Sequence, residues 1–179
     1  MRMRLDKFST GAYFPGGLIK RVTWYLINAF IFNTSLPFPS AVKVRFLRVF
    51  GAKVGGGVLI KPCVNIKYPW FLKIGDNCWI GEGVWIDNLG LVVIGNNVCL
   101  SQGCLLLTGS HNYKVSTFDL IVGNIVLEDG VWIGAKAIVC PNVVCEIESV
   151  LTSGSVATGS LVKQGVFQGN PATLKRLRH

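Results

Sequence analysis

A six-residue repeat begins at residue 54 and continues to residue 162. From Leu127 onward six hexads follow one another without a break, each beginning with an aliphatic or small apolar residue: LEDGVW, IGAKAI, VCPNVV, CEIESV, LTSGSV and ATGSLV. The same frame continues upstream in sets of three hexads that begin at Ile94, Ile74 and Val54. A period of six fits neither an amphipathic helix nor a long alternating strand, and among repeat architectures it is typical of the parallel β-helix.

The interruptions of the period predict three walls. First positions fall at 54/60/66, 74/80/86, 94/100/106, 127/133/139 and 145/151/157, so each interruption follows a third hexad. Two interruptions add two residues each, and the third, between 106 and 127, adds 15. Because stacked coils lie about 4.8 Å apart, we expect every insertion on one corner of a three-sided prism of about five coils.

Each hexad should consist of a short strand and a turn. We expect the first positions to point into the prism, as at Ile74, Ile80, Ile94, Ile133 and Leu151. The fifth positions should supply smaller inward side chains, namely Cys78, Val84, Cys104, Ala137, Val143 and Ser155. Glycine at the second position (Gly55, Gly75, Gly81, Gly95 and Gly134) is expected to relieve the backbone where the chain turns.

The flat walls of such a prism need partners. With 179 residues, of which 50% are hydrophobic, the chain can bury a core as one elongated domain. We expect Trp79, Trp85 and Trp132 to pack between identical prisms in a homotrimer, the alternative being contact with a ligand.

The six cysteines form no C-x-x-C pair, and several occupy repeat positions that call for small apolar residues. We therefore expect reduced core thiols. A reducing cytoplasm is the simpler compartment, and no cleavable signal pattern is recognisable.

Residues 18–50 differ from the repeat, because apolar and basic residues alternate there at helical spacing, with a break at Pro37 and Pro39. Two short helices that cap the open end of the solenoid are expected. The apolar run from 22 to 32 is too short to span a bilayer. It could instead lie on a membrane surface, where anionic lipid would be contacted by Lys20, Arg21, Lys43, Arg45 and Arg48. We accordingly divide the chain into a helical cap at 1–53, a β-helix at 54–163 with an insertion at about 109–124, and a C-terminal tail at 164–179.

The net charge of +9 suits an anionic partner such as coenzyme phosphates, a nucleotide sugar, a lipid pyrophosphate or an anionic lipid. No basic, aromatic-rich nucleic-acid module is recognisable, so no nucleic-acid partner is expected.

The long insertion is where we expect the chemistry, because it contains the one internal histidine, His111. An imidazole titrates near neutral pH and is a natural general base. Asp87 and Asn88 leave the preceding coil at the same corner, so they should lie within roughly 10 Å of the insertion. They could bind an acceptor hydroxyl or simply terminate a strand.

Several motifs resemble the hexapeptide-repeat acyltransferases. These are the hexads, TGSHNY around His111, VWIGAKAI from Val131, SGSV at 153–156 and GNPA at 169–172. FGAKVG (50–55), YPW (68–70) followed by IGDNCWIG, and LSQ (100–102) are similar to acetyltransferases of colanic acid and related exopolysaccharide biosynthesis.

The resemblance implies a left-handed β-helix, a trimer, acetyl-CoA as donor and a sugar hydroxyl as acceptor. It assigns the catalytic role to His111, and it places Asn112 and Tyr113 with Asp87 and Asn88 at the acceptor. The coenzyme would be held by Gly134, Ala135, Ser153, Gly154, Lys163, Lys175 and Arg176. The expected mechanism is direct transfer, with His111 taking the hydroxyl proton and backbone N–H groups near Gly134 and Ala135 or Ser153 and Gly154 meeting the oxyanion.

Other functions stay open or are excluded by the residues. A zinc enzyme of the γ-carbonic anhydrase type needs three histidines per site, so we expect no metal. A cysteine nucleophile would need an exposed thiol in an electropositive setting. A non-catalytic scaffold, or an acetyltransferase for a small free sugar, amino sugar or antibiotic, would share the fold.

Overall fold

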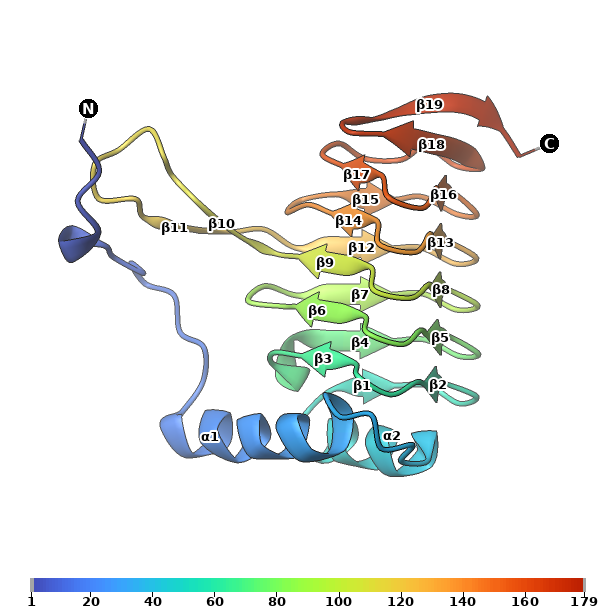
Figure 1. Cartoon of the computed structure of the whole chain (residues 1–179), viewed down its shortest axis with the longest axis horizontal. Helices are drawn as coiled ribbons and strands as arrows, with labels where there is room; N and C mark the ends of the chain where they lie inside the picture. Colours follow the sequence, from blue (N-terminus) through green and yellow to red (C-terminus); the bar gives the residue numbers. More distant parts are fainter. Residues whose placement is uncertain (1, 179) are drawn as a thin grey trace.

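The computed structural model describes residues 2–178, and it shows short parallel strands stacked into three flat walls with helices across one end (Figure 1). Sheet A contains β1, β4, β7, β12 and β15 (Lys53–Val54, Leu72–Ile74, Val92–Ile94, Ile125–Leu127 and Val144–Cys145). Sheet B contains β2, β5, β8, β13, β16, β18 and β19 (Leu59–Ile60, Trp79–Ile80, Cys99–Leu100, Trp132–Ile133, Val150–Leu151, Gly165–Gly169 and Ala172–Leu177). Sheet C contains β3, β6, β9, β14 and β17 (Asn65–Ile66, Trp85–Asp87, Leu105–Leu107, Ile138–Val139 and Val156–Ala157).

The strand register confirms the predicted β-helix. In sheet A the first positions of successive coils pair in line, from Val54 through Ile74, Ile94 and Leu127 to Cys145. The first and fifth positions expected to point inward are buried, and all of them except the polar Ser155 belong to one apolar core. Beyond the five predicted coils, a bridge between Cys145 and Leu161 and the parallel pairing of β16 with β18 begin a sixth.

The turns are built differently from our expectation. The second-position glycines do not have the left-handed backbone; the fourth position does, as at Asn77 (φ +56°) and Asn97 (φ +55°). Glycine is needed at the second position because the coils stack too closely there for a side chain. A Cβ on Gly75 would lie 2.7 Å from the carbonyl carbon of Gly95 in the next coil. The glycine pattern thus reflects contact between coils rather than the turn within one coil.

Helices α1 (Leu18–Ile27) and α2 (Ser40–Val49), joined by a short π-helical segment (Asn28–Phe32), close the first coil. Each wall has exposed backbone groups at this end, and a side chain from the cap bonds to each wall. At sheet A, Arg48 donates to the carbonyl oxygens of Val54 and Gly55. At sheet B, Lys43 Nζ donates to Lys61 O at 2.8 Å. At sheet C, Trp24 Nε1 donates to Ile66 O at 2.7 Å. The helices therefore satisfy the open sheet edge, as a cap should.

This arrangement alters the membrane hypothesis for residues 18–50. Lys43 is buried, and burial lowers the pKa of its ammonium group. Arg48 is held by its bonds to coil carbonyls. Both cations belong to the cap and not to a docking surface. Within residues 2–178 no helix has the length and apolarity needed to cross a bilayer.

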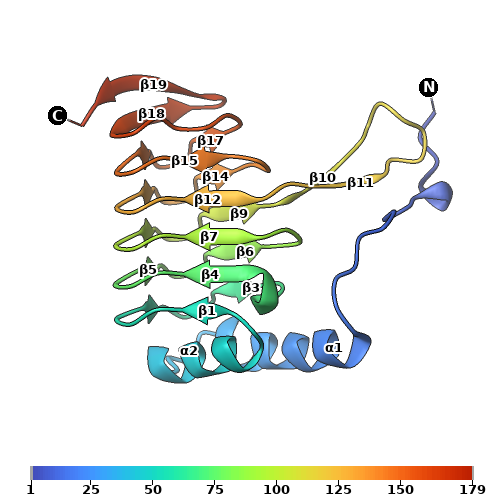
Figure 2. The same cartoon turned by 180° about the vertical axis from the view of Figure 1, so that it is seen from behind.

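The chain before α1 takes a course that the sequence did not suggest. Residues 2–17, including a 3₁₀ turn at Leu5–Lys7, leave the cap and follow the outside of the molecule to the long insertion (Figures 1 and 2). At the other end of the molecule, β18 and β19 form an antiparallel hairpin over the last coil. A second 3₁₀ turn, Pro69–Phe71, fills the first small insertion.

Candidate active site

The long insertion forms an arm, residues 108–124, at the corner where sheet C passes to sheet A. Its strands β10 (Gly109–His111) and β11 (Leu120–Val122) pair antiparallel, and both views show the arm projecting away from the coils (Figures 1 and 2). The base of the arm is fixed by Thr108, whose buried hydroxyl donates to Asp87 O at 2.8 Å. The insertions stack on one corner as predicted, and the two-stranded ribbon carries His111 outward.

The imidazole of His111 is held on several sides. Nδ1 lies 3.1 Å from the carbonyl oxygen of Phe118, and the phenyl ring of Phe118 stacks on the imidazole with centroids 4.2 Å apart and planes inclined by 6°. The ring of Phe8 lies 5.6 Å away on a tilted plane. Because a carbonyl can only accept, the neutral ring carries its hydrogen on Nδ1. Nε2 is left with the lone pair that a general base requires.

The N-terminal segment supports this arm. Arg4 N donates to Ser116 O at 2.8 Å, and Leu120 N donates to Ser9 O at 3.2 Å. Sequence reasoning missed Phe8 and Phe118 because neither belongs to a hexad or a polar motif. The only available signal was the presence of two phenylalanines in segments that have no repeat.

Asp87 lies at the base of the arm, as expected. Lys67 Nζ is 3.0 Å from Asp87 Oδ1, which makes an ion pair. The geometry of this contact does not make a hydrogen bond, and no described residue donates a hydrogen bond to Oδ1. A buried carboxylate oxygen in that state can accept a hydrogen bond from a hydroxyl group.

Asn88 is placed differently. Its side chain is fully buried, Nδ2 donates to Tyr68 O at 2.6 Å, and Oδ1 accepts from Tyr68 N at 3.0 Å. The side-chain amide of Asn88 therefore links two coils, which agrees with the alternative that this residue terminates a strand. It is not accessible to an acceptor.

Asn112 and Tyr113 follow His111 at the turn of the arm. Asn112 Oδ1 accepts from Lys114 N at 3.1 Å, and its backbone N–H donates to Asp119 O. Tyr113 is exposed. Asn112 therefore shapes the turn, and Tyr113 is available to a partner or a ligand.

Four of the residues expected at the coenzyme come together at a second corner, where sheet B passes to sheet C. Gly134 and Ala135 stack beneath Ser153 and Gly154, and Gly154 N donates to Ala135 O at 2.9 Å. A Cβ on Gly134 would lie 2.4 Å from Ser153 N, so only glycine fits there.

Backbone hydrogen bonds at this corner occupy some of the N–H groups expected to bind the oxyanion and leave others free. Gly134 N donates to Leu151 O at 2.7 Å, and Gly154 N is occupied by Ala135 O. The N–H groups of Ala135 and Ser153 have no partner among the described residues. These two are therefore the donors free to meet a developing negative charge.

The three cations expected at the coenzyme are dispersed. Lys163 lies at the third corner, where sheet A passes to sheet B, and its backbone N–H donates to Glu146. Lys175 and Arg176 are exposed on β19, which is the edge strand of sheet B.

Two core thiols are poorly suited to act as nucleophiles, and a metal-ligand cluster is not found among the described residues. Burial raises the pKa of Cys104 and of Cys145 to about 12, so neither forms a thiolate at neutral pH. Among residues 2–178 no group of three His, Cys, Asp or Glu side chains could hold a metal ion.

No family model matches the chain. The WcaF protein of Escherichia coli (strain K12), whose name assigns it to colanic acid biosynthesis as an acetyltransferase, is 36% identical over 175 residues, covering 97% of this chain and 96% of WcaF. Galactoside O-acetyltransferase of the same organism is 26% identical and covers 81% of this chain and 73% of its own. In solved structures, a hexapeptide-repeat acetyltransferase of Vibrio cholerae O1 biovar eltor, complexed with acetyl-CoA, has a TM-score of 0.81 at 23% identity, covering 89% of this chain and 87% of that one.

Proposed function

Because the chain belongs to the hexapeptide-repeat acetyltransferases, we propose that it transfers the acetyl group of acetyl-CoA to a sugar hydroxyl during synthesis of an exopolysaccharide or surface glycan. The observation that carries the proposal is the state of His111. Its ring is fixed by Phe118, and Nε2 is the nitrogen left to take a proton.

The transfer needs no covalent enzyme intermediate. The acceptor hydroxyl gives its proton to His111 Nε2 as its oxygen forms a bond to the thioester carbonyl carbon. The N–H groups of Ala135 and Ser153 stabilise the oxyanion, the bond from carbon to sulfur breaks, and the proton passes to the departing coenzyme thiolate. Asp87 would accept a hydrogen bond from the acceptor.

Within one chain, His111 lies at the corner between sheets C and A, whereas Ala135 and Ser153 lie at the corner between sheets B and C. The proposed base and the oxyanion donors are therefore on opposite sides of sheet C. The arm also projects away from its own coils (Figure 2). A complete site therefore requires His111 of one protomer beside Ala135 and Ser153 of another. Three prisms packed by their walls would form three such sites, and exposed Trp79 and Trp132 on sheet B supply apolar wall surface.

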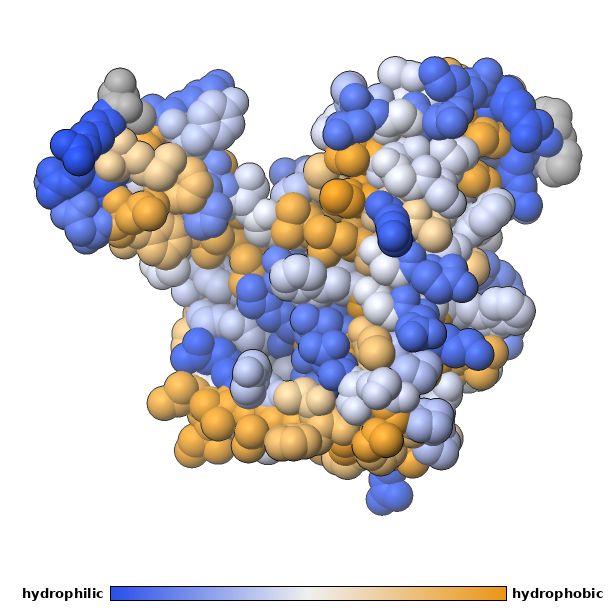
Figure 3. All heavy atoms as spheres, in the orientation of Figure 1, coloured by the Kyte–Doolittle hydropathy of each residue, from blue (hydrophilic) through white to orange (hydrophobic). Residues whose placement is uncertain are grey.

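We also propose that the capped end touches a membrane that carries the acceptor. An apolar band follows the outer side of α1 and continues past it, with Ile19 84% and Phe30 69% exposed (Figure 3). Lys20 and Arg45 are exposed cations at this end. Wall packing would leave the capped ends of all protomers on one face of the trimer, and acetyl-CoA as donor would place that face on the cytoplasmic side.

The proposed function is tested with the full chain, acetyl-CoA and a panel of acceptors. p-Nitrophenyl β-D-galactoside, p-nitrophenyl β-D-glucoside and lipid-linked oligosaccharides are compared, with release of the coenzyme thiol and mass spectrometry of the product as readouts. Acetylated sugar that depends on His111 supports the proposal. Coenzyme binding without transfer to any sugar would contradict it and favour a scaffold, whereas efficient transfer to the simple galactoside alone would favour a small free acceptor.

The trimer and the membrane contact have separate tests. Sedimentation in dilute buffer should give a trimer, and a stable monomer would remove the site between protomers. Anionic vesicles should bind the chain at low salt and release it at high salt. Phe30→Asp should abolish binding while Thr23→Asp, a matched change on an exposed polar position of α1, should weaken it less. Absence of binding at low salt would eliminate the docking role.

A further inference from the structure

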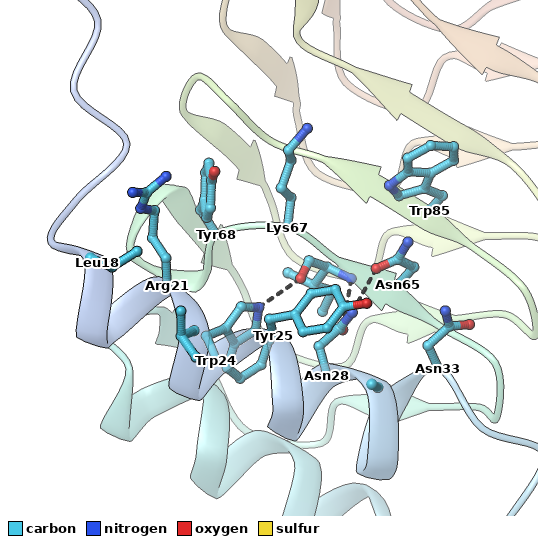
Figure 4. A pocket seen from close by; sticks show the side chains of 13 residues that line it. Leu18, Arg21, Trp24, Tyr25, Asn28, Asn33, Asn65, Lys67, Tyr68 and Trp85 are labelled. Carbon is cyan, nitrogen blue, oxygen red and sulfur yellow. Dashed lines mark hydrogen bonds between the residues drawn. The ribbon is translucent and has the colours of Figure 1, made fainter.

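A cleft of about 450 Å³ lies between α1 and sheet C, next to the corner that carries the arm (Figure 4). We propose that this cleft binds a second sugar of the acceptor, one that bears a negatively charged group. The inference rests on the proposed function, and it adds a specificity site to it: the reacting sugar would lie at the arm, and its neighbour in the glycan would lie in the cleft.

The cleft presents two free aromatic rings. Trp85, on the outer face of sheet C, is 44% exposed, and Tyr25, on α1, is 70% exposed. Neither ring packs against another aromatic ring in the described part of the chain. Flat apolar surfaces with a few polar groups at the edges are typical of small-molecule sites, and sugars present flat C–H faces to such rings.

Polar groups without partners surround these rings. Arg21 Nε is buried and has no hydrogen-bond partner in the described part of the chain. Asn65 Oδ1 accepts from Asn28 Nδ2 at 2.7 Å, so the Nδ2 of Asn65 is left to donate. The side chain of Asn33, which also lines the cleft, makes no hydrogen bond within residues 2–178. A buried guanidinium nitrogen without a partner is costly unless a ligand supplies an acceptor.

The charge of the cleft selects the class of ligand. Arg21 and Lys67 extend toward the same side of the cleft, and the 13 lining residues include no Asp or Glu (Figure 4). Arg21 has no ion pair with any of residues 2–178, whereas Lys67 is paired with Asp87. An anionic group is therefore the favoured partner for Arg21, either a sugar carboxylate or the phosphate of a glycosyl phosphate.

The cleft is continuous with the acceptor corner. Lys67 lines the cleft and contacts the carboxylate of Asp87, and the backbone of Asp87 is bonded to Thr108 at the base of the arm. Residues 67 and 68 lie between sheet C and the 3₁₀ turn at the same corner. A glycan bound at Asp87 would thus extend into the cleft without crossing a wall.

Binding of two matched probes tests the inference independently of turnover. p-Nitrophenyl β-D-glucuronide and p-nitrophenyl β-D-glucoside differ in one carboxylate, and titration calorimetry measures both. We expect the glucuronide to bind about tenfold more tightly, as a charge-assisted bond to Arg21 implies. Glucose 1-phosphate is a third probe, and tighter binding of it than of the glucuronide would assign the site to a glycosyl phosphate.

Two pairs of variants give the controls. Arg21→Gln should remove the preference for the charged probe, and Arg21→Lys should keep most of it. Trp85→Ala should weaken both probes about fivefold, and Trp85→Phe should weaken them less, because an aromatic face is retained. Equal affinity for both probes in the unaltered chain, or no loss in Arg21→Gln, would overturn the inference.

The outcomes separate the cleft from the proposed function. If sugars are acetylated but the Arg21 and Trp85 variants bind both probes normally, the cleft is not an acceptor site. If Trp85→Ala converts a trimer to monomers in sedimentation, Trp85 belongs to a wall between protomers, and the inference is also overturned. If the charged probe binds as expected but no sugar is ever acetylated, the cleft binds sugar and the proposed reaction fails.

Discussion

Replacement of His111 should affect catalysis far more than replacement of the rings that hold it. His111→Ala removes the proposed base, whereas Phe118→Ala removes only the stacked ring, because the acceptor for Nδ1 is the backbone carbonyl of residue 118. Phe118 already has a positive φ of 52°, and alanine at that position would add no new backbone strain. The two variants therefore separate the chemical role of the imidazole from its orientation.

The expected magnitudes differ clearly. Loss of a positioned general base lowers kcat by about 10²–10⁴-fold. The stacked pair, with centroids 4.2 Å apart, contributes about 0.5–1.5 kcal/mol to holding the ring. If all of this free energy were needed to orient the base, kcat of Phe118→Ala would fall about 2- to 13-fold.

Initial rates at varied acetyl-CoA and acceptor concentrations give kcat and KM for each variant, and sedimentation shows whether assembly is kept. Phe14→Ala is the control for loss of a phenyl ring, because Phe14 lies in the N-terminal segment that supports the arm and is exposed. His111→Ala should change kcat and leave coenzyme binding intact. Turnover within threefold of the unaltered chain would refute the base assignment. An equal loss in Phe14→Ala and Phe118→Ala would refute the role of the stacked ring.

Three further predictions concern the fold. Leu100→Ala, in the core of sheet B, should lower the free energy of unfolding by about 2–5 kcal/mol, and an unchanged urea midpoint would contradict the packing described. Arg48→Ala removes the donor to the exposed carbonyls of Val54 and Gly55 and should lower the free energy of unfolding by about 0.5–1.5 kcal/mol, seen as a lower Tm; an unchanged Tm would mean that water replaces the cap. Because burial raises the pKa of Cys104 and Cys145 to about 12, the folded chain holds their protons where the unfolded chain has lost them. Stability should therefore fall as pH rises between about 9 and 12, and native Cys104 should resist alkylation at neutral pH; rapid labelling would disprove its burial.

The sequence was sufficient to predict the walls, the core and the position of the arm. Hexads put an apolar side chain on the inner face of every strand, and interruptions after each third hexad could only stack on one corner. The motif around His111 led to the proposed base through chemistry and resemblance alone. The glycine pattern was also visible in the sequence, but its cause was misassigned, because the contact is between residues of successive coils, such as Gly75 and Gly95, that are far apart in the sequence.

Tertiary structure alone decided which side chains support the site. Asn88 was equally compatible with a ligand or a strand end until its amide was found bonded to Tyr68. Lys43 looked like a surface cation until it proved to cap a buried carbonyl. The support of His111 comes from Phe8 and Phe118, and the cleft joins α1 to sheet C. The repeat pattern reflects only contacts within a coil and between neighbouring coils. Contacts made by segments outside the repeat depend on where the folded chain places those segments.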